Sequence, residues 1–174
     1  TKIDSQGPAL TGCPSPTALF TCISDVLAAP TVTALDDCDG VVAVTYTQVP
    51  ATLPTSSCNQ TITRTWSATD ACGHNTTCQQ VITVNDTVPP TVTAGTLSQL
   101  WYPTVAAAEA AAIAATMTSD NCGGVTLTAS TAGTTCAVVV TVTGKDSCNN
   151  AASVDYHTKI DSQGPALTGC PSPT

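Results

Sequence analysis

Short runs in which valine or isoleucine alternates with threonine recur along most of the chain. They cover residues 31–33, 41–47, 61–69, 81–84, 91–93, 125–128 and 138–143. Glycine, proline, asparagine and aspartate separate the runs, as turn residues do between short antiparallel strands. Side chains two residues apart share one face of a strand, so the alternation gives each strand an apolar and a polar face. The pattern predicts an all-β chain of sandwich architecture.

One segment departs from this alternation. Residues 105–115 read VAAAEAAAIAA, a stretch of strong helix formers without any turn residue. Its composition predicts a short helix in place of strand material. We expect this helix to pack on the flank of a sandwich.

A repeat sets the organisation of the chain. The seventeen residues of segment 1–17, TKIDSQGPALTGCPSPT, recur without change at 158–174, an offset of 157 residues. Within that period, the DCDG string at 37–40 corresponds to NCGG at 121–124. The pattern predicts tandem modules: residues 1–7 end a preceding module, 8–89 form module one, 90–164 form module two and 165–174 begin the next module one. An engineered overlap or a single duplication would also produce the repeated segment.

Composition narrows the class of protein. Charged residues make up 9% of the chain and the net charge is −8, which disfavours nucleic acid as a partner because phosphate binding needs a basic surface. No apolar run approaches the roughly eighteen residues of a membrane span. Ten cysteines among 174 residues indicate disulfides and an oxidising, extracellular or cell-surface location. Zinc is disfavoured, because Cys72 and Cys78 have no second closely spaced pair to complete a site.

The residues of module one carry a resemblance. The string TRTWSATDACGHNTTCQQVITVNDTVPP at 63–90, with an upstream Cys-Pro and a D-x-C turn, resembles the HYR-like and related immunoglobulin-like repeats of long surface proteins. The resemblance is good over module one and weaker over module two, which has the alanine-rich segment and lacks one cysteine. It implies a seven-strand sandwich in an extracellular protein with an adhesive or structural role, and it implies no catalytic residues.

The implied sandwich suggests how the cysteines pair. Segments that the fold places at the same pole can be bridged, which favours the bonds Cys13–Cys78, Cys38–Cys72 and Cys22–Cys58 in module one and Cys122–Cys148 in module two. Six cysteines allow fifteen connectivities, so this assignment is one of several. Cys136 corresponds to Cys58 but has no counterpart of Cys22. We expect it to be a buried free thiol, with a bond to another chain as the alternative.

Acidic and amide side chains gather where modules meet. At the first junction the candidates are Asp4, Asp36, Asp37, Asp39 and Asp70, and at the second they are Asp86, Asp120, Asn121, Asp146 and Asn149. Calcium takes six to eight oxygen ligands, which two loops and a linker can supply together. The sequence therefore suggests calcium at the junctions, although aspartate and asparagine are also ordinary turn residues.

Three N-x-Thr sequons, at Asn59, Asn75 and Asn85, make covalent glycans a further expectation. Residues Thr61, Thr63 and Thr65 lie on one face of the predicted strand at 61–69 and are candidate O-glycan acceptors. A threonine-rich face chosen for its β-propensity alone would look the same.

Nothing in the chain suggests catalysis. The histidines His74 and His157 have no nucleophile and orienting partner nearby, and Glu109 is the single glutamate. We therefore expect no enzyme, but a structural repeat of an extracellular, glycosylated filament whose partners are copies of itself. The alternatives are the spacer stalk of a cell-surface adhesin and, less favoured, a carbohydrate- or ice-binding module.

Overall fold

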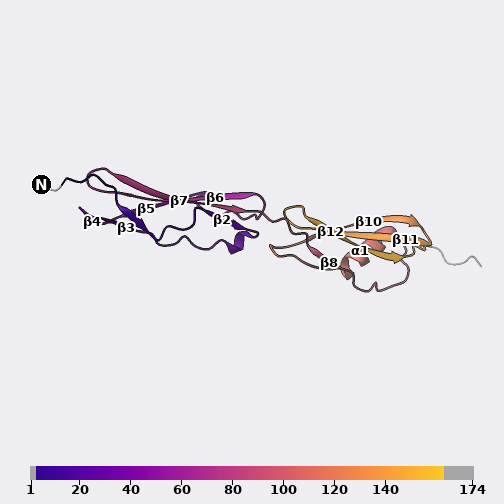
Figure 1. Cartoon of the computed structure of the whole chain (residues 1–174). Coiled ribbons are helices and arrows are strands. Elements are labelled where there is room, and N and C mark those ends of the chain that lie inside the picture. The colour runs from indigo at the N-terminus through magenta and orange to yellow at the C-terminus, as the bar shows by residue number, and fades with distance from the viewer. Residues whose placement is uncertain (1–2, 163–174) are drawn as a thin grey trace, which may run out of the picture. The chain divides into compact units, whose positions relative to one another are not determined.

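The computed structural model describes residues 3–162 and divides the chain into two compact units, Thr1–Thr87 and Val88–Thr174. Strands dominate both units, and the described residues contain one α-helix and one short 3-10 helix (Figure 1). The prediction of an all-β, immunoglobulin-like fold is confirmed. The boundary between the units falls two residues before the expected end of module one. No described helix has the length and apolar character needed to span a membrane.

Unit one is built from two sheets that together contain seven strands. One sheet has the order β1-β3-β4, formed by Ala9–Thr11, Thr33–Asp36 and Gly40–Val42. The other has the order β2-β7-β6-β5, formed by Thr17–Phe20, Asn75–Val84, Gln60–Thr69 and Val44–Val49. A 3-10 helix, Ile23–Asp25, follows β2. All strand pairs of this unit are antiparallel except β2 with β7, which run parallel. Seven strands are what the resemblance to immunoglobulin-like repeats implies.

The longest strands of unit one show how the sequence alternation becomes a core. On β6, Ile62, Trp66 and Ala68 are at most 2% exposed, and the threonines between them face outward. Ile62 of this face packs with Ile82 and Val84 of β7. The strand thus separates an apolar face from a hydroxyl face, as its period of two predicts.

Arg64 is the polar exception on the buried face of β6. It is 4% exposed, and its guanidinium donates to Gln48 Oε1 at 3.1 Å and to the backbone oxygen of Leu27 at 2.8 Å. A buried charge is tolerated where its donors are satisfied. Arg64 therefore ties β6 to β5 and to the segment before β3.

Unit two combines a three-stranded sheet, a two-stranded sheet and an α-helix. Its main sheet has the order β10-β11-β12, formed by Thr126–Thr134, Ala137–Lys145 and Ala151–Thr158. A two-stranded sheet pairs β8, Thr91–Thr93, with β9, Met117–Ser119. The helix α1 spans Val105–Ala115, as the alanine-rich segment predicts, and Thr104 caps it by accepting a hydrogen bond from the Ala107 amide at 3.2 Å.

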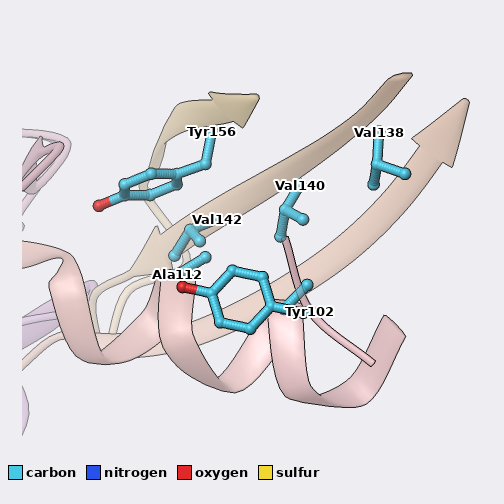
Figure 2. Close-up of a cluster of buried hydrophobic side chains, with 7 residues drawn as sticks. Tyr102, Ala112, Val138, Val140, Val142 and Tyr156 are labelled. Atoms are coloured by element: carbon cyan, nitrogen blue, oxygen red, sulfur yellow. The ribbon is translucent and has the colours of Figure 1, made fainter. Parts of the chain in front are cut away.

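The core of unit two lies between α1 and the inner face of the three-stranded sheet (Figure 2). Valines of β11 meet the small side chains of the helix, and two tyrosines close the core. Its members are Tyr102, Ala108, Ala112, Val138, Val140, Val142 and Tyr156. The Tyr156 hydroxyl lies 2.9 Å from Thr116 Oγ1 and accepts from the Gly95 amide at 3.1 Å, so a buried phenol finds its partners.

Candidate metal site at one pole of unit one

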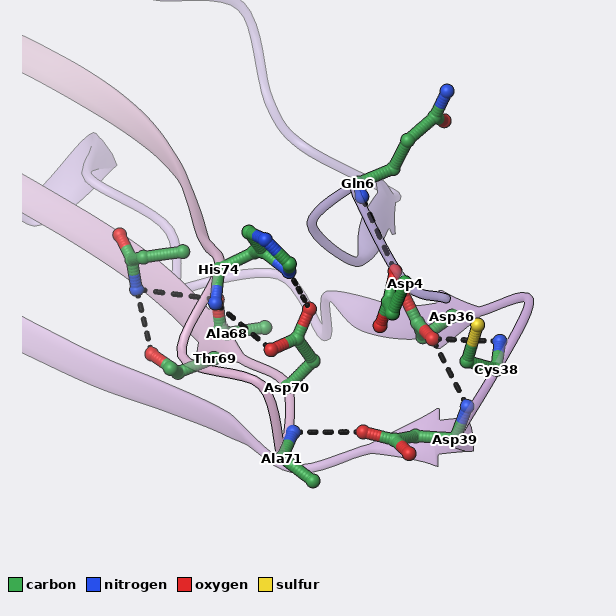
Figure 3. A network of polar contacts seen from close by, with 11 residues as sticks. Asp4, Gln6, Asp36, Cys38, Asp39, Ala68, Thr69, Asp70, Ala71 and His74 are labelled. Atoms are coloured by element: carbon green, nitrogen blue, oxygen red, sulfur yellow. Dashed lines mark hydrogen bonds and ion pairs between the residues drawn. The ribbon is translucent and has the colours of Figure 1, made fainter. Parts of the chain in front are cut away.

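Two turns of unit one lie side by side at the same end of its sheets (Figure 3). In the turn between β3 and β4, Asp36 Oδ1 accepts from the amides of Cys38 at 2.8 Å and Asp39 at 2.9 Å. The carboxylate of Asp39 reaches across to the second turn and accepts from the Ala71 amide at 2.7 Å. The two turns are therefore fixed to each other by a charge-assisted hydrogen bond.

In the second turn, between β6 and β7, Asp70 is 7% exposed and holds His74 through both of its oxygens. Oδ1 accepts from the His74 amide at 2.8 Å, and Oδ2 lies 2.9 Å from His74 Nδ1. Burial raises the pKa of Asp70, but the hydrogen bonds from His74 outweigh this effect and hold the pKa below its ordinary value. Asp70 is therefore ionised at neutral pH.

The segment before β1 brings a fourth carboxylate to these turns. Asp4 Oδ1 accepts from the Gln6 amide at 3.2 Å, whereas Asp4 Oδ2 is buried and has no hydrogen-bond partner. Asp4 belongs to two groups whose ligand atoms all lie within 4.8 Å of one another. One group adds Asp36, Asp37 and Cys38, and the other adds Asp70 and His74. A buried carboxylate oxygen without a donor is costly unless a cation compensates it.

The donor set fits a hard cation better than a soft one. Four carboxylates, from Asp4, Asp36, Asp37 and Asp70, supply oxygens, and backbone carbonyls or water would complete a calcium shell of six to eight. The one cysteine in the groups, Cys38, lacks the further sulfur ligands that a zinc site uses. Of the five aspartates predicted at this junction, four belong to these two groups, which share Asp4. Asp39 is in neither group, and its carboxylate accepts from the Ala71 amide.

His74 is the member of this cluster that sequence reasoning missed. An isolated histidine beside a sequon looks like a loop residue. Its spacing of four residues from Asp70, across a turn, is the signal that links the two side chains.

The aspartates predicted at the second junction mainly hold their own turns. Asp120 Oδ1 accepts from the Cys122 amide at 2.9 Å, and its Oδ2 is buried without a hydrogen-bond partner. Asp146 accepts from the amides of Cys148 and Asn150 and from the Asn150 side chain. Carboxylate oxygens of Asp120 and Asp146 lie within 4.8 Å of each other.

Three further residues were predicted at that junction. Asn121 donates to Cys122 Sγ, and Asn149 takes a left-handed turn conformation with φ 68°. Asp86 is 3% exposed near the end of unit one, and its amide donates to the Ser57 oxygen at 2.9 Å. A cation bound by these residues stays a prediction.

The cysteines form three disulfides among the described residues. Cys13 bonds Cys78 with a Cα–Cα distance of 6.3 Å, as the sequence predicts. The other bonded cysteines are Cys22, Cys58, Cys122 and Cys148. A hydrogen bond from the Ile23 amide to Ser57 Oγ at 3.0 Å brings the neighbours of Cys22 and Cys58 together, in accord with the predicted bond between them.

The predicted Cys38–Cys72 bond is wrong for this structure, because Cys72 carries an exposed free thiol. Cys38 Sγ is instead directed toward the aspartates, within 4.8 Å of a carboxylate oxygen from each of Asp4, Asp36 and Asp37. Partial loss of solvent and the carboxylates of Asp4 and Asp70 raise the pKa of the Cys72 thiol, which disfavours the thiolate that disulfide exchange requires. The hydrogen bond from Ala71 to Asp39 joins the two turns in place of sulfur.

The expectation that Cys136 is a buried free thiol is wrong in one respect. It is a free thiol, as predicted, but it is exposed rather than buried, because it lies in the turn between β10 and β11. A bond to another chain stays a prediction.

The candidate sugar acceptors lie on the surface of unit one. Asn59 is exposed, and its amide donates to Asn85 Oδ1 at 3.1 Å. The Asn75 side chain is also exposed, but its Nδ2 lies within 3.1 Å of oxygens on Ser67, Ala68 and Thr69. A glycan on Asn75 would therefore have to form before those contacts do. Thr61, Thr63 and Thr65 lie on the outward face of β6. Glycosylation at any of these residues stays a prediction.

Comparison with known proteins agrees with this geometry. No curated protein matches the chain. Residues 14–84, most of unit one, match the family model of the HYR-like domain with 4 cysteines. This segment contains β2 to β7 and the two turns that carry Asp36, Asp37 and Asp70. Together with Asp4, these aspartates form what we call the acidic pole of unit one. Such disulfide-rich domains are typical of extracellular proteins. The resemblance recognised in the sequence is thus confirmed over unit one, which is similar to HYR-like domains.

Proposed function

We propose that this chain is a structural repeat of an extracellular filament in which units one and two alternate. The single observation that supports the proposal is that the repeated segment, found at 1–17 and again at 158–174, contributes to both kinds of unit. In its second copy, Thr158 ends β12 and Ile160 pairs with Tyr102 of unit two. In its first copy, Ala9–Thr11 forms β1 of unit one. A segment that both closes one kind of unit and opens the other suits a chain that continues through many repeats.

The disulfides and the hydroxyl faces fit this role. Small cores with few aromatic residues gain stability from disulfides, and 3% of the chain is aromatic. The outer face of β6 presents threonine hydroxyls in place of charge, on a surface that could also carry sugar. An adhesin stalk would use the same units as spacers for a distal binding domain and is the second reading.

The test is intact-mass and glycopeptide analysis of the native material, followed by electron microscopy. Uniform filaments whose chains contain many copies of the 157-residue period, with sugar on Asn59, Asn85 or the β6 threonines, are expected. Cell-attached single chains with a distinct tip would favour the stalk. A native chain with one period and no neighbouring copy would refute both readings.

We also propose that the acidic pole of unit one binds calcium. Support comes from Asp4 Oδ2, which is buried without a hydrogen-bond donor beside three further carboxylates. A cation there would stabilise the folded unit, because the oxygens are brought together by folding. Free calcium at a hundred times its dissociation constant would add about 2.7 kcal/mol.

Thermal unfolding of the 174-residue chain, with calcium or with excess chelator, tests this proposal. Calcium should raise the unfolding temperature of unit one, and Asp4→Asn should abolish the increase. Asp39→Asn is the matched control, since it removes the same charge from the same pole but at a carboxylate committed to Ala71. Equal unfolding temperatures in calcium and in chelator would contradict the proposal.

A further inference from the structure

The two copies of the repeated segment are seen in different surroundings. At the end of unit two, the Ile160 amide donates to the Thr135 oxygen at 2.7 Å, and the Asp161 amide donates to the Tyr102 oxygen at 2.9 Å. Ile160 packs half-buried against the core of unit two. Ile3, the same residue in the first copy, is 88% exposed. The start of the repeated segment therefore packs on unit two where a unit two precedes it, and is exposed in the first copy.

Beside this contact, unit two has an apolar hollow of about 600 Å³. Its lining includes Leu100, Trp101, Cys136, Val139, His157 and Lys159. Leu100 is 89% exposed and Trp101 is 52% exposed. Large apolar side chains gathered at one exposed hollow are typical of an interaction surface.

Chain length limits what can lie next to the hollow. Lys159 lines it, and Asp161 follows two residues later, at most about 7 Å along an extended chain. Asp161 is the counterpart of Asp4, whose carboxylate belongs to the acidic pole of unit one. In a chain that continues through another repeat, the acidic pole of the next copy must therefore begin within about 7 Å of the hollow.

The two surfaces are complementary. Near its acidic turns, unit one has exposed apolar side chains on β3 and β4, with Leu35 61% and Val41 85% exposed. Four carboxylates lie at the same pole, and the lining of the hollow in unit two includes the positively charged Lys159. Apolar side chains can thus meet Trp101 and Leu100, while opposite charges face each other.

We propose that the hollow around Trp101 receives the acidic pole of the following copy of this chain, so that consecutive repeats dock directly without a free linker. The inference rests on the proposed function, because it needs a unit one after each unit two. Docking buries Trp101 and covers the Cys136 thiol. It also places the calcium-binding aspartates at the joint, so that a cation bound there stiffens the contact between repeats.

The experiment compares Cys136 in three chains that end at different points. The first ends at residue 162, the second has all 174 residues, and the third continues the 174 residues with residues 18–87 of a further copy. Maleimide labelling is followed at Cys136 by peptide mass analysis, which separates it from the other thiols. We expect the labelling rate to fall about tenfold or more in the third chain alone, since a covered thiol reacts only when its cover opens.

Val41→Asp in the added copy should restore fast labelling, and formation of that copy's Cys13–Cys78 bond shows that the copy has folded. Equal rates in the second and third chains would overturn the proposal. Two other results would also overturn it: slow labelling already in the second chain, which would make segment 163–174 the cover, and slowing that grows with protein concentration, which would make the cover a separate molecule. The mass of the native chain tests the tandem array independently, so the two proposals can fail separately.

Discussion

Removing the Cys13–Cys78 disulfide should weaken unit one strongly. The bond joins residues 65 positions apart, and the loop-closure relation for a crosslink of that length gives about 4 kcal/mol. A unit of 87 residues has a total stability of about 4–13 kcal/mol at the usual values per residue. The double variant Cys13→Ala/Cys78→Ala should therefore lose from a third to nearly all of the stability of unit one.

Urea unfolding followed by peptide-resolved hydrogen exchange would measure this loss, because it reads the two units separately. Unit two should keep its stability in the double variant. Cys136→Ala is the matched control, since it removes an exposed thiol that has no disulfide. A loss of less than about 1 kcal/mol in unit one would refute the reasoning, because crosslinking would then restrict the unfolded chain far less than the loop-closure relation requires.

Three substitutions test the packing of the two units by the same assay. Arg64→Ala should cost unit one about 3 kcal/mol, because it removes two charge-assisted hydrogen bonds and leaves Gln48 Oε1 and the Leu27 oxygen without this donor; a loss below 1 kcal/mol would show that water replaces the guanidinium. Val140→Ala should cost unit two about 2–3 kcal/mol, since the side chain is fully buried; an unchanged midpoint would mean that the core closes over the cavity. Gly144→Ala should cost about 1–3 kcal/mol, because a Cβ there would lie 2.8 Å from a methyl group of Val92, whereas Gly124→Ala has open space and should change little.

Alternation of side chains predicted the long central strands, because their two faces differ sharply. On β6 the predicted run 61–69 differs from the observed strand by one residue. Strand β12 was missed, although Val154 and Tyr156 face the core, because an alanine-rich start and Asp155 weaken its pattern. The helix was found at its observed bounds, since eleven residues of high propensity are flanked by a threonine cap and a threonine stop.

The acidic pole was harder to predict in detail. Sequence places Asp36, Asp37, Asp39 and Asp70 in two neighbouring turns, but it does not say which carboxylate will be used to join them. Asp39 takes that role. The direction of the Cys38 side chain, toward carboxylates and not toward Cys72, likewise depends on the hydrogen bonds that Asp36 makes inside its own turn.

The outer face of β6 binds water through uncharged hydroxyl groups and not through charged side chains. Hydroxyl groups hold water without a net field, so their hydration changes little with salt, whereas carboxylate clusters are screened as ionic strength rises. A filament built from these units would keep the same lateral behaviour in dilute and in salty water. Its response to dissolved ions would be strongest at the acidic pole of each unit one, where the carboxylates lie closest together.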